Sequence, residues 1–370
     1  MQILRNAKFS TSIKNLNLKS KGNEIANENK IKTILGIGSP LIDICAQTNS
    51  ETLTKYGLEF GRTVLADEEK RPFFNVLERS ADVTYIPGGS VCNSIRVMNW
   101  MLKNNENYKC AMLGSVGNDT NGKRIIELLN SQNILTLLEI QNNKISGRCA
   151  VGIYNKERCL MPEINASEDL TLNFIESMEN EINHHEYLLV EGYFVDKKGT
   201  PVVKKLVQNF QERKKPIVFT LSAVFVIELY YDSILEVAKF SDIIFCNKEE
   251  AECFSRKDKN TDLEEISLEM HRLLDSKKDR IIIITCGEDP VFASIYSAEN
   301  KKVDFYINAP SKIPNEEIID TNGCGDSFVG GFLAKFIQNE SIEECLKAGN
   351  WASSVIIRNI GCSFPEECEY

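Results

Sequence analysis

Short apolar runs alternate with amphipathic segments along the chain from residue 31 onward. Runs rich in β-branched residues are typical of buried strands, and we expect strands at 34–37, 109–113, 187–190, 217–221, 242–246 and 280–285. Apolar positions spaced three and four residues apart predict helices at 90–103, 122–129, 201–211, 262–274 and 341–357. Strand–helix alternation on this scale predicts an α/β fold with a mostly parallel central sheet that helices cover on both faces.

Two stretches, 42–84 and 134–161, interrupt the alternation, and the second contains strand-like runs at 149–154 and 158–161. We predict that they form a small, partly β lid inserted in two passes. Residues 31–43, 85–140 and 166–370 would then make a large α/β catalytic domain, and 44–84 and 141–165 the small lid domain. Residues 1–30 are expected to be a disordered extension. Their basic character up to Lys21, without any acidic residue, leaves a mitochondrial transit peptide as the alternative.

Composition excludes several classes of protein. The formal net charge of −10 argues against a nucleic-acid partner, because phosphate backbones are bound by surplus Lys and Arg. No apolar run approaches the roughly 20 residues that span a bilayer, so we expect no membrane partner. Twelve scattered cysteines without a C-x-x-C pair indicate reduced thiols in an intracellular protein, and only three histidines leave no zinc-site spacing. We therefore expect a cytoplasmic protein, with the nucleus as a second compartment.

The segment Asp320-Thr321-Asn322-Gly323-Cys324-Gly325-Asp326 stands before apolar positions with helical spacing at 328, 329, 332, 333 and 336. Backbone N–H groups of Gly323, Cys324 and Gly325 would lie at the start of that helix. Unpaired donors and the helix dipole attract phosphate there. A carboxylate in the same turn would repel phosphate, so we assign Asp326 the task of taking a proton from an attacking hydroxyl. The segment predicts phosphoryl transfer to an alcohol; a glycine turn before an ordinary helix is the alternative.

Two other patterns typical of nucleotide binding are incomplete. Residues 117–123 have the glycine and lysine spacing of a P-loop, but Arg124 replaces the Ser or Thr that would hold Mg²⁺. Gly36-Ile37-Gly38 begins like a dinucleotide fingerprint, but Leu41 stands where the third glycine belongs. We expect neither pattern to bind a nucleotide.

Two further segments have both a structural and a functional interpretation. The Gly88-Gly89 pair precedes a helix whose first turn carries Asn93; it is either a ligand-binding turn or a plain turn with Ser90 as the N-cap. Asn247 and Glu250 follow the strand at 242–246. They form either a capping box or a site where Glu250 holds a water of hydrated Mg²⁺.

Together, four segments resemble the ribokinase-like sugar and nucleoside kinases over residues 31–366: 38–43, Gly88-Gly89-Ser90 with Asn93, Asn247-x-x-Glu250, and 320–326. Residues 93–97, 221–225 and 356–366 resemble the branch of that family that phosphorylates adenosine. The resemblance implies a ribokinase-like fold. It also implies ATP-dependent phosphorylation of the adenosine 5′-hydroxyl to AMP and ADP, as in purine salvage, with Mg²⁺ as cofactor. Adenosine and ATP are the expected partners of a monomeric enzyme.

The resemblance also assigns roles residue by residue. Asp326 matches the catalytic base, Gly323, Cys324 and Gly325 match the anion hole, and Arg158 matches a lid arginine that contacts phosphate. The positions that match adenosine-binding residues are Asp43, Gly88, Gly89, Asn93, Cys149, Tyr193 and Phe225. Those that match the ATP site are Asn247, Thr285, Gly287, Gly323, Gly325 and Asn350, and the Mg²⁺ positions are Glu250, through a metal-bound water, and Asn247.

Several positions depart from the family pattern. Cys324 replaces the usual alanine of the anion hole, Thr63 replaces a glutamine near the base, and residues 163–168 are more polar and acidic than expected. A thiol at a helix N-terminus can have a lowered pKa and be reactive, so Cys324 is either reactive or merely small enough to fit. The departures leave two alternatives to adenosine phosphorylation. One is a related kinase of another nucleoside or a sugar, and the other is a catalytically weak nucleoside-binding protein.

Overall fold

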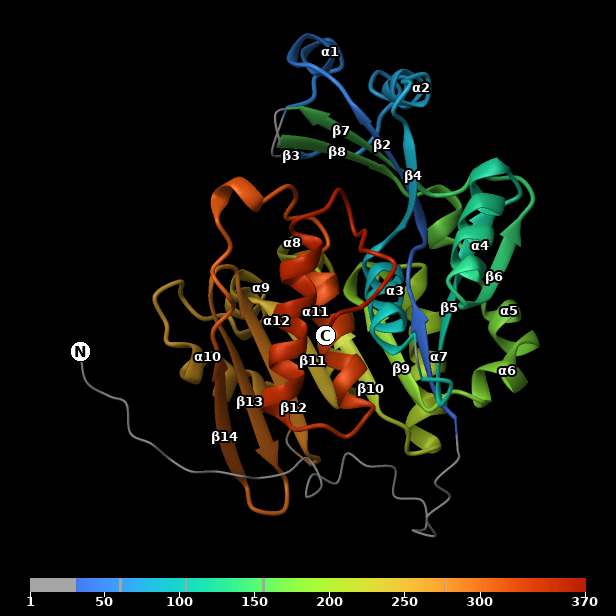
Figure 1. Cartoon of the computed structure of the whole chain (residues 1–370). Helices are drawn as coiled ribbons and strands as arrows, with labels where there is room; N and C mark the ends of the chain where they lie inside the picture. Colours follow the sequence, from blue (N-terminus) through green and yellow to red (C-terminus); the bar gives the residue numbers. More distant parts are fainter. Residues whose placement is uncertain (1–30, 60–61, 104, 155–156, 276) are drawn as a thin grey trace.

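A nine-stranded sheet forms the centre of the protein in the computed structural model, with the order β14-β13-β12-β11-β10-β9-β1-β5-β6 (Figure 1). The structure describes residues 31–370 except 60–61, 104, 155–156 and 276, so the predicted N-terminal extension lies outside the described residues. The strands are β1 Lys32–Ile37, β5 Tyr108–Gly117, β6 Leu135–Gln141, β9 Tyr187–Glu191, β10 Ile217–Thr220, β11 Ile243–Asn247, β12 Arg280–Cys286, β13 Asp289–Ser297 and β14 Lys302–Asn308.

The six strands predicted from apolar runs occupy six neighbouring places in this sheet, from β12 to β5, and pair in parallel. The prediction of a mostly parallel sheet is confirmed. β13 and β14 add an antiparallel edge that the strand–helix alternation did not indicate.

Helices cover both faces of the large sheet, as predicted, because the strands are apolar on both sides. In β12, Ile281 and Ile283 pack into one core, and Ile282 and Ile284 into the other. The first core is covered by α3 Ser90–Leu102, α4 Thr120–Ser131, α11 Cys324–Phe336 and α12 Ile342–Ile356. The second is covered by α5 Leu172–Ser177, α6 Glu179–Asn183, α7 Gly199–Glu212, α8 Val224–Phe240, α9 Lys248–Ser255 and α10 Leu263–Leu273.

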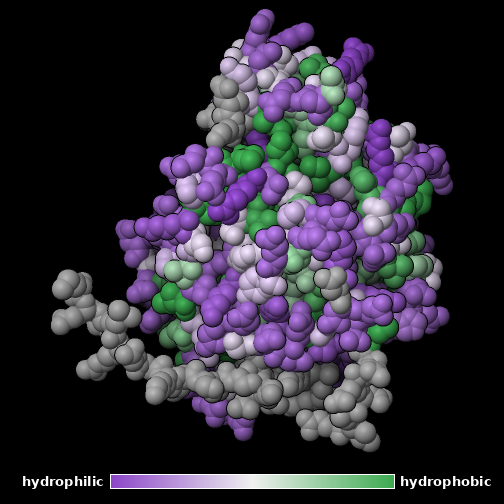
Figure 2. Space-filling view, viewed as in Figure 1, coloured by the Kyte–Doolittle hydropathy of each residue, from purple (hydrophilic) through white to green (hydrophobic). Residues whose placement is uncertain are grey.

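A second, five-stranded sheet lies above the large one in Figure 1, with the order β3-β8-β7-β2-β4. Its elements come from the two interrupting stretches. They are β2 Leu41–Gln47, β3 Arg62–Thr63, β4 Thr84–Gly88, β7 Arg148–Tyr154 and β8 Glu157–Glu163, with α1 Ser50–Lys55 and α2 Pro72–Glu78. Cys45, Cys149, Val151 and Ile153 form a small apolar core of this sheet. Figure 2 shows apolar side chains gathered between this upper part and the body of the molecule.

The first part of the stretch 134–161 lies in the large sheet, within the range 85–140 expected for the large domain. Residues 135–141 form β6, which pairs in parallel with β5 along seven positions from Ala111↔Leu135 to Gly117↔Gln141. The run resembles the strands of the small sheet in composition, and sequence does not say which sheet a short apolar strand joins.

Helix α8 was not predicted. Its chain departs from helical geometry at Tyr230 (φ −129°). Large apolar side chains also stand on its exposed side, at Phe225 and Leu229, which weakens the amphipathic contrast on which the helix predictions depend. Among the described residues, no helix has the length and apolar character needed to cross a membrane.

Both incomplete nucleotide motifs have structural roles. Asp119, inside the P-loop-like segment, caps α4 by accepting from Gly122 N (2.8 Å) and also accepts from Ser146 Oγ (2.6 Å). Gly36 lets α3 approach β1, since a Cβ there would lie 2.5 Å from Val91 Cγ1. Neither segment offers a free backbone cradle.

Candidate active site

Asp326 lies in the first turn of α11, where two side chains from α3 hold its carboxylate. Gly323 caps the helix in a left-handed conformation (φ 75°) that favours glycine. Ser90 Oγ donates to Asp326 Oδ1 at 2.7 Å, and Asn93 Nδ2 donates to Oδ2 at 3.0 Å. Burial raises the pKa of Asp326, and these two hydrogen bonds oppose the shift because they favour the charged form. The result is an oriented carboxylate that can accept a proton.

The start of α3 differs from the plain turn considered above. The N-cap is Gly89 (φ 98°), not Ser90, and a Cβ at Gly89 would lie 2.2 Å from the Ser39 carbonyl oxygen. Ser90 is therefore free to direct its hydroxyl at Asp326. Asn93 is 8% exposed, and its Oδ1 is a buried acceptor without a hydrogen-bond partner in the described part of the chain. Such an acceptor fits a ligand hydroxyl, because a buried polar atom left unpaired costs free energy.

Asp43 lies on β2 against the same turn. The approach is close: a Cβ on Gly88 would be 2.5 Å from Asp43 Oδ1. Burial raises the pKa of Asp43 to about 7; Arg96 opposes this, Asp320 and Asp326 add to it, and Arg158 opposes it. Several charges therefore converge on one small volume. Cys149, opposite Asp43 in the β2–β7 pairing, is a buried neutral thiol whose pKa burial raises well above its usual value.

Asp320 organises the loop that leads into α11. Its Oδ1 accepts from Asn322 N (2.9 Å), and its Oδ2 accepts from Gly361 N (2.7 Å). It also forms a buried ion pair with Arg158 of β8, so the small sheet reaches this loop directly. Burial raises the pKa of Asp320 and lowers that of Arg158. Arg158 Nε and Nη2 have no hydrogen-bond partner among the described residues, so both can bind an anion.

The glycine cradle is open at its second glycine. A Cβ on Gly325 would meet nothing within 4 Å, whereas one on Gly323 would lie 3.1 Å from Cys362 Cβ. Cys324 N donates to Thr321 O at 3.3 Å, which closes the turn before the helix. The cradle therefore has room for an anion on the Gly325 side, next to Asp326.

Of the two alternatives for Cys324, its surroundings favour the small, unreactive side chain. Burial raises the pKa of this thiol to about 12, and Asp320 and Asp326 raise it further. Desolvation and two nearby carboxylates disfavour a thiolate more strongly than the helix terminus favours it. Cys324 is a small neutral side chain of the cradle.

Tyr193 and Phe225 form an exposed aromatic pair. Tyr193 follows β9 and Phe225 lies in the first turn of α8; their ring centroids are 6.0 Å apart at an interplanar angle of 41°. The residues are 45% and 56% exposed, which is unusual for large rings held against each other. They offer a stacking surface for a flat ligand.

Asn247 and Glu250 form the capping box of α9. Asn247 Oδ1 accepts from Glu250 N (2.8 Å), and Glu250 Oε2 accepts from Asn247 N (3.1 Å). Burial raises the pKa of Glu250 to about 7, and Asp326 and Glu249 add to the shift. A cation would relieve this crowding of negative charge. In the described part of the chain no three His, Cys, Asp or Glu side chains cluster as metal ligands, so these residues form no cage of direct metal ligands.

The remaining positions expected at the ATP site lie beside this helix or on α12. Thr285 pairs with Asn247 across β11 and β12, and Gly287 follows in a left-handed turn (φ 63°) with open space around it. Asn350 donates instead to Asn308 Oδ1 (2.7 Å). One turn further along α12, Ser353 Oγ donates to Cys324 O (2.8 Å), which connects α12 to the cradle.

Sequence reasoning missed Glu191, which ends β9 and is 1% exposed. Its carboxylate accepts from Ser39 N (2.7 Å) and Val91 N (2.8 Å). A Cβ on Gly38 would lie 2.5 Å from Glu191 Cδ, so the buried carboxylate leaves no room for a side chain at position 38. The only local signal is a charged residue that ends an apolar strand before Gly192.

Two of the departures from the family pattern are also placed. Glu163 is 8% exposed and pairs with Arg71 Nε (2.6 Å) and Arg148 Nε (2.8 Å), so its charge is neutralised within the small sheet. Thr63 lies on β3, paired with Leu160 of β8.

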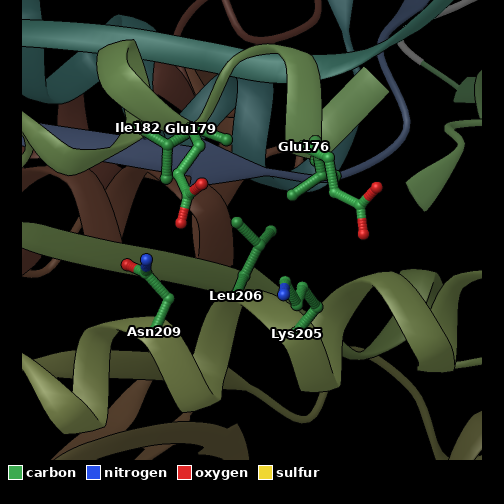
Figure 3. Close-up of a pocket in the computed structure, with 7 residues that line it drawn as sticks. Glu176, Glu179, Ile182, Lys205, Leu206 and Asn209 are labelled. Atoms are coloured by element: carbon green, nitrogen blue, oxygen red, sulfur yellow. The ribbon is translucent and has the colours of Figure 1, made fainter. Parts of the chain in front are cut away.

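A separate hollow of about 240 Å³ lies between α5, α6 and α7 (Figure 3). It has an apolar floor that includes Ile182 and Leu206, and exposed charges at its rim. Its lining residues are Ile175, Glu176, Glu179, Ile182, Lys205, Leu206 and Asn209. None of them belongs to the site around Asp326.

The sequence as a whole is similar to those of known kinases. Residues 51–368 match the pfkB family carbohydrate kinases. The chain is 31% identical over 344 residues to adenosine kinase 2 of Arabidopsis thaliana, which covers 91% of this chain and 97% of the relative. It is 32% identical over 337 residues to adenosine kinase of Dictyostelium discoideum, with 90% and 96% covered.

Solved structures show the same similarity. The crystal structure of Anopheles gambiae adenosine kinase in complex with P1,P4-di(adenosine-5) tetraphosphate superposes with a TM-score of 0.78 at 30% identity, covering 91% of this chain and 98% of that one. Schistosoma mansoni adenosine kinase in complex with 2-fluoroadenosine gives a TM-score of 0.77 at 25% identity, with 90% and 97% covered. The predicted ribokinase-like fold is confirmed by these neighbours.

Proposed function

The chain belongs to the pfkB family of carbohydrate kinases, and from this premise we propose that it phosphorylates the 5′-hydroxyl of adenosine with ATP, giving AMP and ADP. Relatives above 30% identity over about nine-tenths of the chain are adenosine kinases. The observation that carries the proposal is the position of Asp326, held by Ser90 and Asn93 beside the open Gly325 cradle.

Adenosine would bind between the turn at the start of α3 and the aromatic pair. Asp43 and the free Oδ1 of Asn93 accept hydrogen bonds from the ribose hydroxyls, Gly88 and Gly89 permit the close approach, and Cys149 lines the pocket. The purine stacks on Tyr193 and Phe225, whose exposed rings otherwise cost hydration free energy. The ribose terminal oxygen then faces Asp326.

ATP would bind on the other side of Asp326. The amides of Gly323 and Gly325 receive its terminal phosphates at the helix N-terminus, and Cys324 N joins them when it exchanges Thr321 O for a phosphate oxygen. Arg158 offers Nε and Nη2. The rest of the nucleotide extends over Asn247 of β11, Thr285 of β12, Gly287 in the turn after β12, and Asn350 of α12.

Mg²⁺ would be held through its water ligands by Glu250 and Asn247. When bound, it supplies positive charge to the phosphate oxygens. Glu250 suits this outer position because its carboxylate is already fixed by the capping box, and because burial raises its pKa to about 7 in a negative environment. Asn247 fixes that carboxylate through Nδ2, which donates to Oε1 at 2.7 Å.

Catalysis would combine positioning with proton transfer. Asp326 accepts the proton of the 5′-hydroxyl while the oxygen attacks the γ-phosphorus, and the cradle amides with Arg158 stabilise the charge on the transferred group. General-base help of this kind is typically worth about 10²–10⁴ in rate. Residues 44–84 and 141–165 act as the lid domain over the large domain formed by 31–43, 85–140 and 166–370, and exclude water when they close.

Two further proposals concern the whole protein. Twelve free cysteines support a reducing compartment, for which we propose the cytoplasm, with the nucleus as a second location. A monomer is proposed because one chain contributes every residue of the site.

Product analysis after incubation with Mg²⁺-ATP tests the proposed function. Adenosine should yield equal amounts of AMP and ADP, whereas ribose and guanosine should yield far less of their monophosphates. A preference for ribose would show that the aromatic pair does not select a base and would favour a sugar kinase. Adenosine binding by calorimetry without ADP release would instead favour a nucleoside-binding protein.

A further inference from the structure

Arg96 is a buried cation that the proposed chemistry does not use. It lies in the middle of α3 and is 4% exposed. No carboxylate in the described part of the chain forms an ion pair with it. Its Nη1 donates to Pro87 O and Cys362 O, each at 2.9 Å, and its Nε donates to Gln132 Oε1 at 3.1 Å. Burying an arginine without a paired carboxylate costs free energy of folding, so we expect this side chain to serve a function.

The two carbonyl partners of Arg96 belong to two different walls of the site. Pro87 precedes Gly88, against which the Asp43 carboxylate packs. Cys362 follows Gly361, whose N–H donates to Asp320 Oδ2, the oxygen that also pairs with Arg158. The guanidinium of Arg96 therefore connects the turn that contacts the Asp43 carboxylate with the loop that supports the anion cradle.

The same cation also acts on Asp43 through its charge. After burial, Arg96 is the largest influence on the pKa of Asp43, and it lowers that pKa. The other charged groups that face Asp43 are Asp320 and Asp326, which raise its pKa, and Arg158, which lowers it. The remaining titratable neighbours are thiols with raised pKa values, which stay neutral: Cys45, Cys92, Cys149 and Cys362.

We propose that Arg96 is a positioning residue that fixes the Gly88–Gly89 turn against the C-terminal loop at 360–363 and favours the ionised form of Asp43 for binding ribose hydroxyls. This inference rests on the proposed function, because it takes Asp43 as the group that binds the sugar. An ionised carboxylate accepts two hydroxyl hydrogen bonds and binds them more strongly than a neutral acid does. The guanidinium plane suits this task because it presents several donors in a fixed fork.

The test is adenosine affinity, measured by calorimetry from pH 6 to pH 9 without ATP, for wild type, Arg96→Gln and Arg96→Lys. We expect Arg96→Gln to bind adenosine roughly fivefold more weakly at pH 7, because a pKa of Asp43 higher by about one unit lowers its ionised fraction from about one half to about one eleventh. The deficit should shrink as the pH rises to 9. Arg96→Lys keeps the charge, so its pH profile should stay close to that of wild type while its affinity falls by a pH-independent factor.

Arg124→Gln is the matched control, since Arg124 on α4 stacks over Tyr85 of β4 at 3.9 Å and contacts neither Pro87 nor Cys362. It should change thermal stability without changing the pH profile.

An Arg96→Gln profile parallel to that of wild type overturns the charge role, and Arg96→Lys with wild-type affinity overturns the role of the fork. Should Arg96→Gln not fold, Arg96→Lys decides through its affinity. A wild-type protein that binds no adenosine would instead refute the proposed function itself.

Discussion

Asn93 and Asp326 are 233 positions apart in the chain, yet Asn93 Nδ2 donates to Asp326 Oδ2 at 3.0 Å, so two helix N-termini meet at one carboxylate. Ser90 fixes the other oxygen. α3 and α11 pack side by side, and Gly330 permits the contact: a Cβ there would lie 2.5 Å from Ser94 O. This helix packing sets the position of Asp326, the proposed general base, relative to Asn93 Oδ1, the proposed acceptor for a ribose hydroxyl.

Asp326→Asn should lower kcat by about 10²–10⁴ while adenosine still binds, because the amide keeps the shape of the carboxylate but cannot accept a proton. Single-turnover rates and calorimetric affinity measure the two effects separately. Asn keeps one acceptor oxygen for Ser90 or Asn93, so the thermal midpoint should change little. A variant with near-native turnover would exclude Asp326 as the base.

The Arg158–Asp320 pair links the small sheet to the anion loop, and both side chains are less than 10% exposed. Removing either partner leaves a buried charge without its counterpart, which typically costs about 3–5 kcal/mol of stability. We expect Arg158→Met and Asp320→Asn each to lower the thermal midpoint. The double variant should regain part of the stability but not the turnover, since the phosphate-binding donors are gone.

A double-mutant cycle of unfolding free energies tests this prediction directly. Additive losses would mean that the two side chains do not interact in solution. Recovery of turnover in the double variant would show that Arg158 serves only to neutralise Asp320.

The central sheet could be predicted from sequence because its strands are continuous apolar runs. Ile281 to Ile284 alternate between two cores, which requires burial on both faces. Residues 135–141 are a mixed run that includes Thr136 and Glu139, and their partner strand is set by tertiary packing. In α8, the exposed apolar side chains of Phe225 and Leu229 weaken the amphipathic pattern. Continuous apolar runs therefore identify strands, whereas a mixed run does not say which sheet it joins.

The candidate site shows the same limit. Asp326, Gly323 and Gly325 lie in one contiguous segment at a predicted helix N-terminus. The unpaired N–H groups and the dipole of that terminus are enough to indicate their chemistry. The contacts of Glu191 with Ser39 and Val91 join residues 152 and 100 positions apart, and nothing in the local sequence encodes them. The sequence leaves the role of Ser90 open because its partner Asp326, 236 positions away, cannot be identified from neighbouring residues.

Tyr193→Ala and Phe225→Ala should each raise the KM for adenosine by roughly 5- to 100-fold, since stacking on an aromatic ring is worth about 1–3 kcal/mol per base. Both rings are exposed, so stability should change little. Leu229→Ala, at another exposed position of α8, is the control and should leave KM unchanged. If all three variants keep the wild-type KM, the purine does not bind on this aromatic surface.

Cys324→Ala should keep turnover within about threefold, because the raised pKa makes the thiol a neutral filler of the cradle, not a nucleophile. Alkylation by iodoacetamide at pH 7.5 should be slow at this position, as mass spectrometry of digested protein can measure. Rapid alkylation that ATP prevents would contradict this and restore a reactive thiolate.

Glu191 should make the stability of the protein fall as the pH rises from about 4.5 to about 7, in opposition to the buried His185 and His271, whose lowered pKa values make stability rise with pH. Burial raises the pKa of Glu191 from 4.5 to about 7, so the folded protein binds a proton that the unfolded chain releases over this interval. The stabilisation is complete below the unfolded pKa and is lost as the pH passes the folded one.

Glu191→Gln removes the titrating group, so the slope of its thermal midpoint against pH should be more positive than that of wild type between 5 and 7.5. Glu228→Gln, at an exposed position of α8, is the control and should keep the wild-type slope. If Glu191→Gln also keeps that slope, Glu191 is ionised throughout the interval and its hydrogen bonds from Ser39 N and Val91 N outweigh its burial.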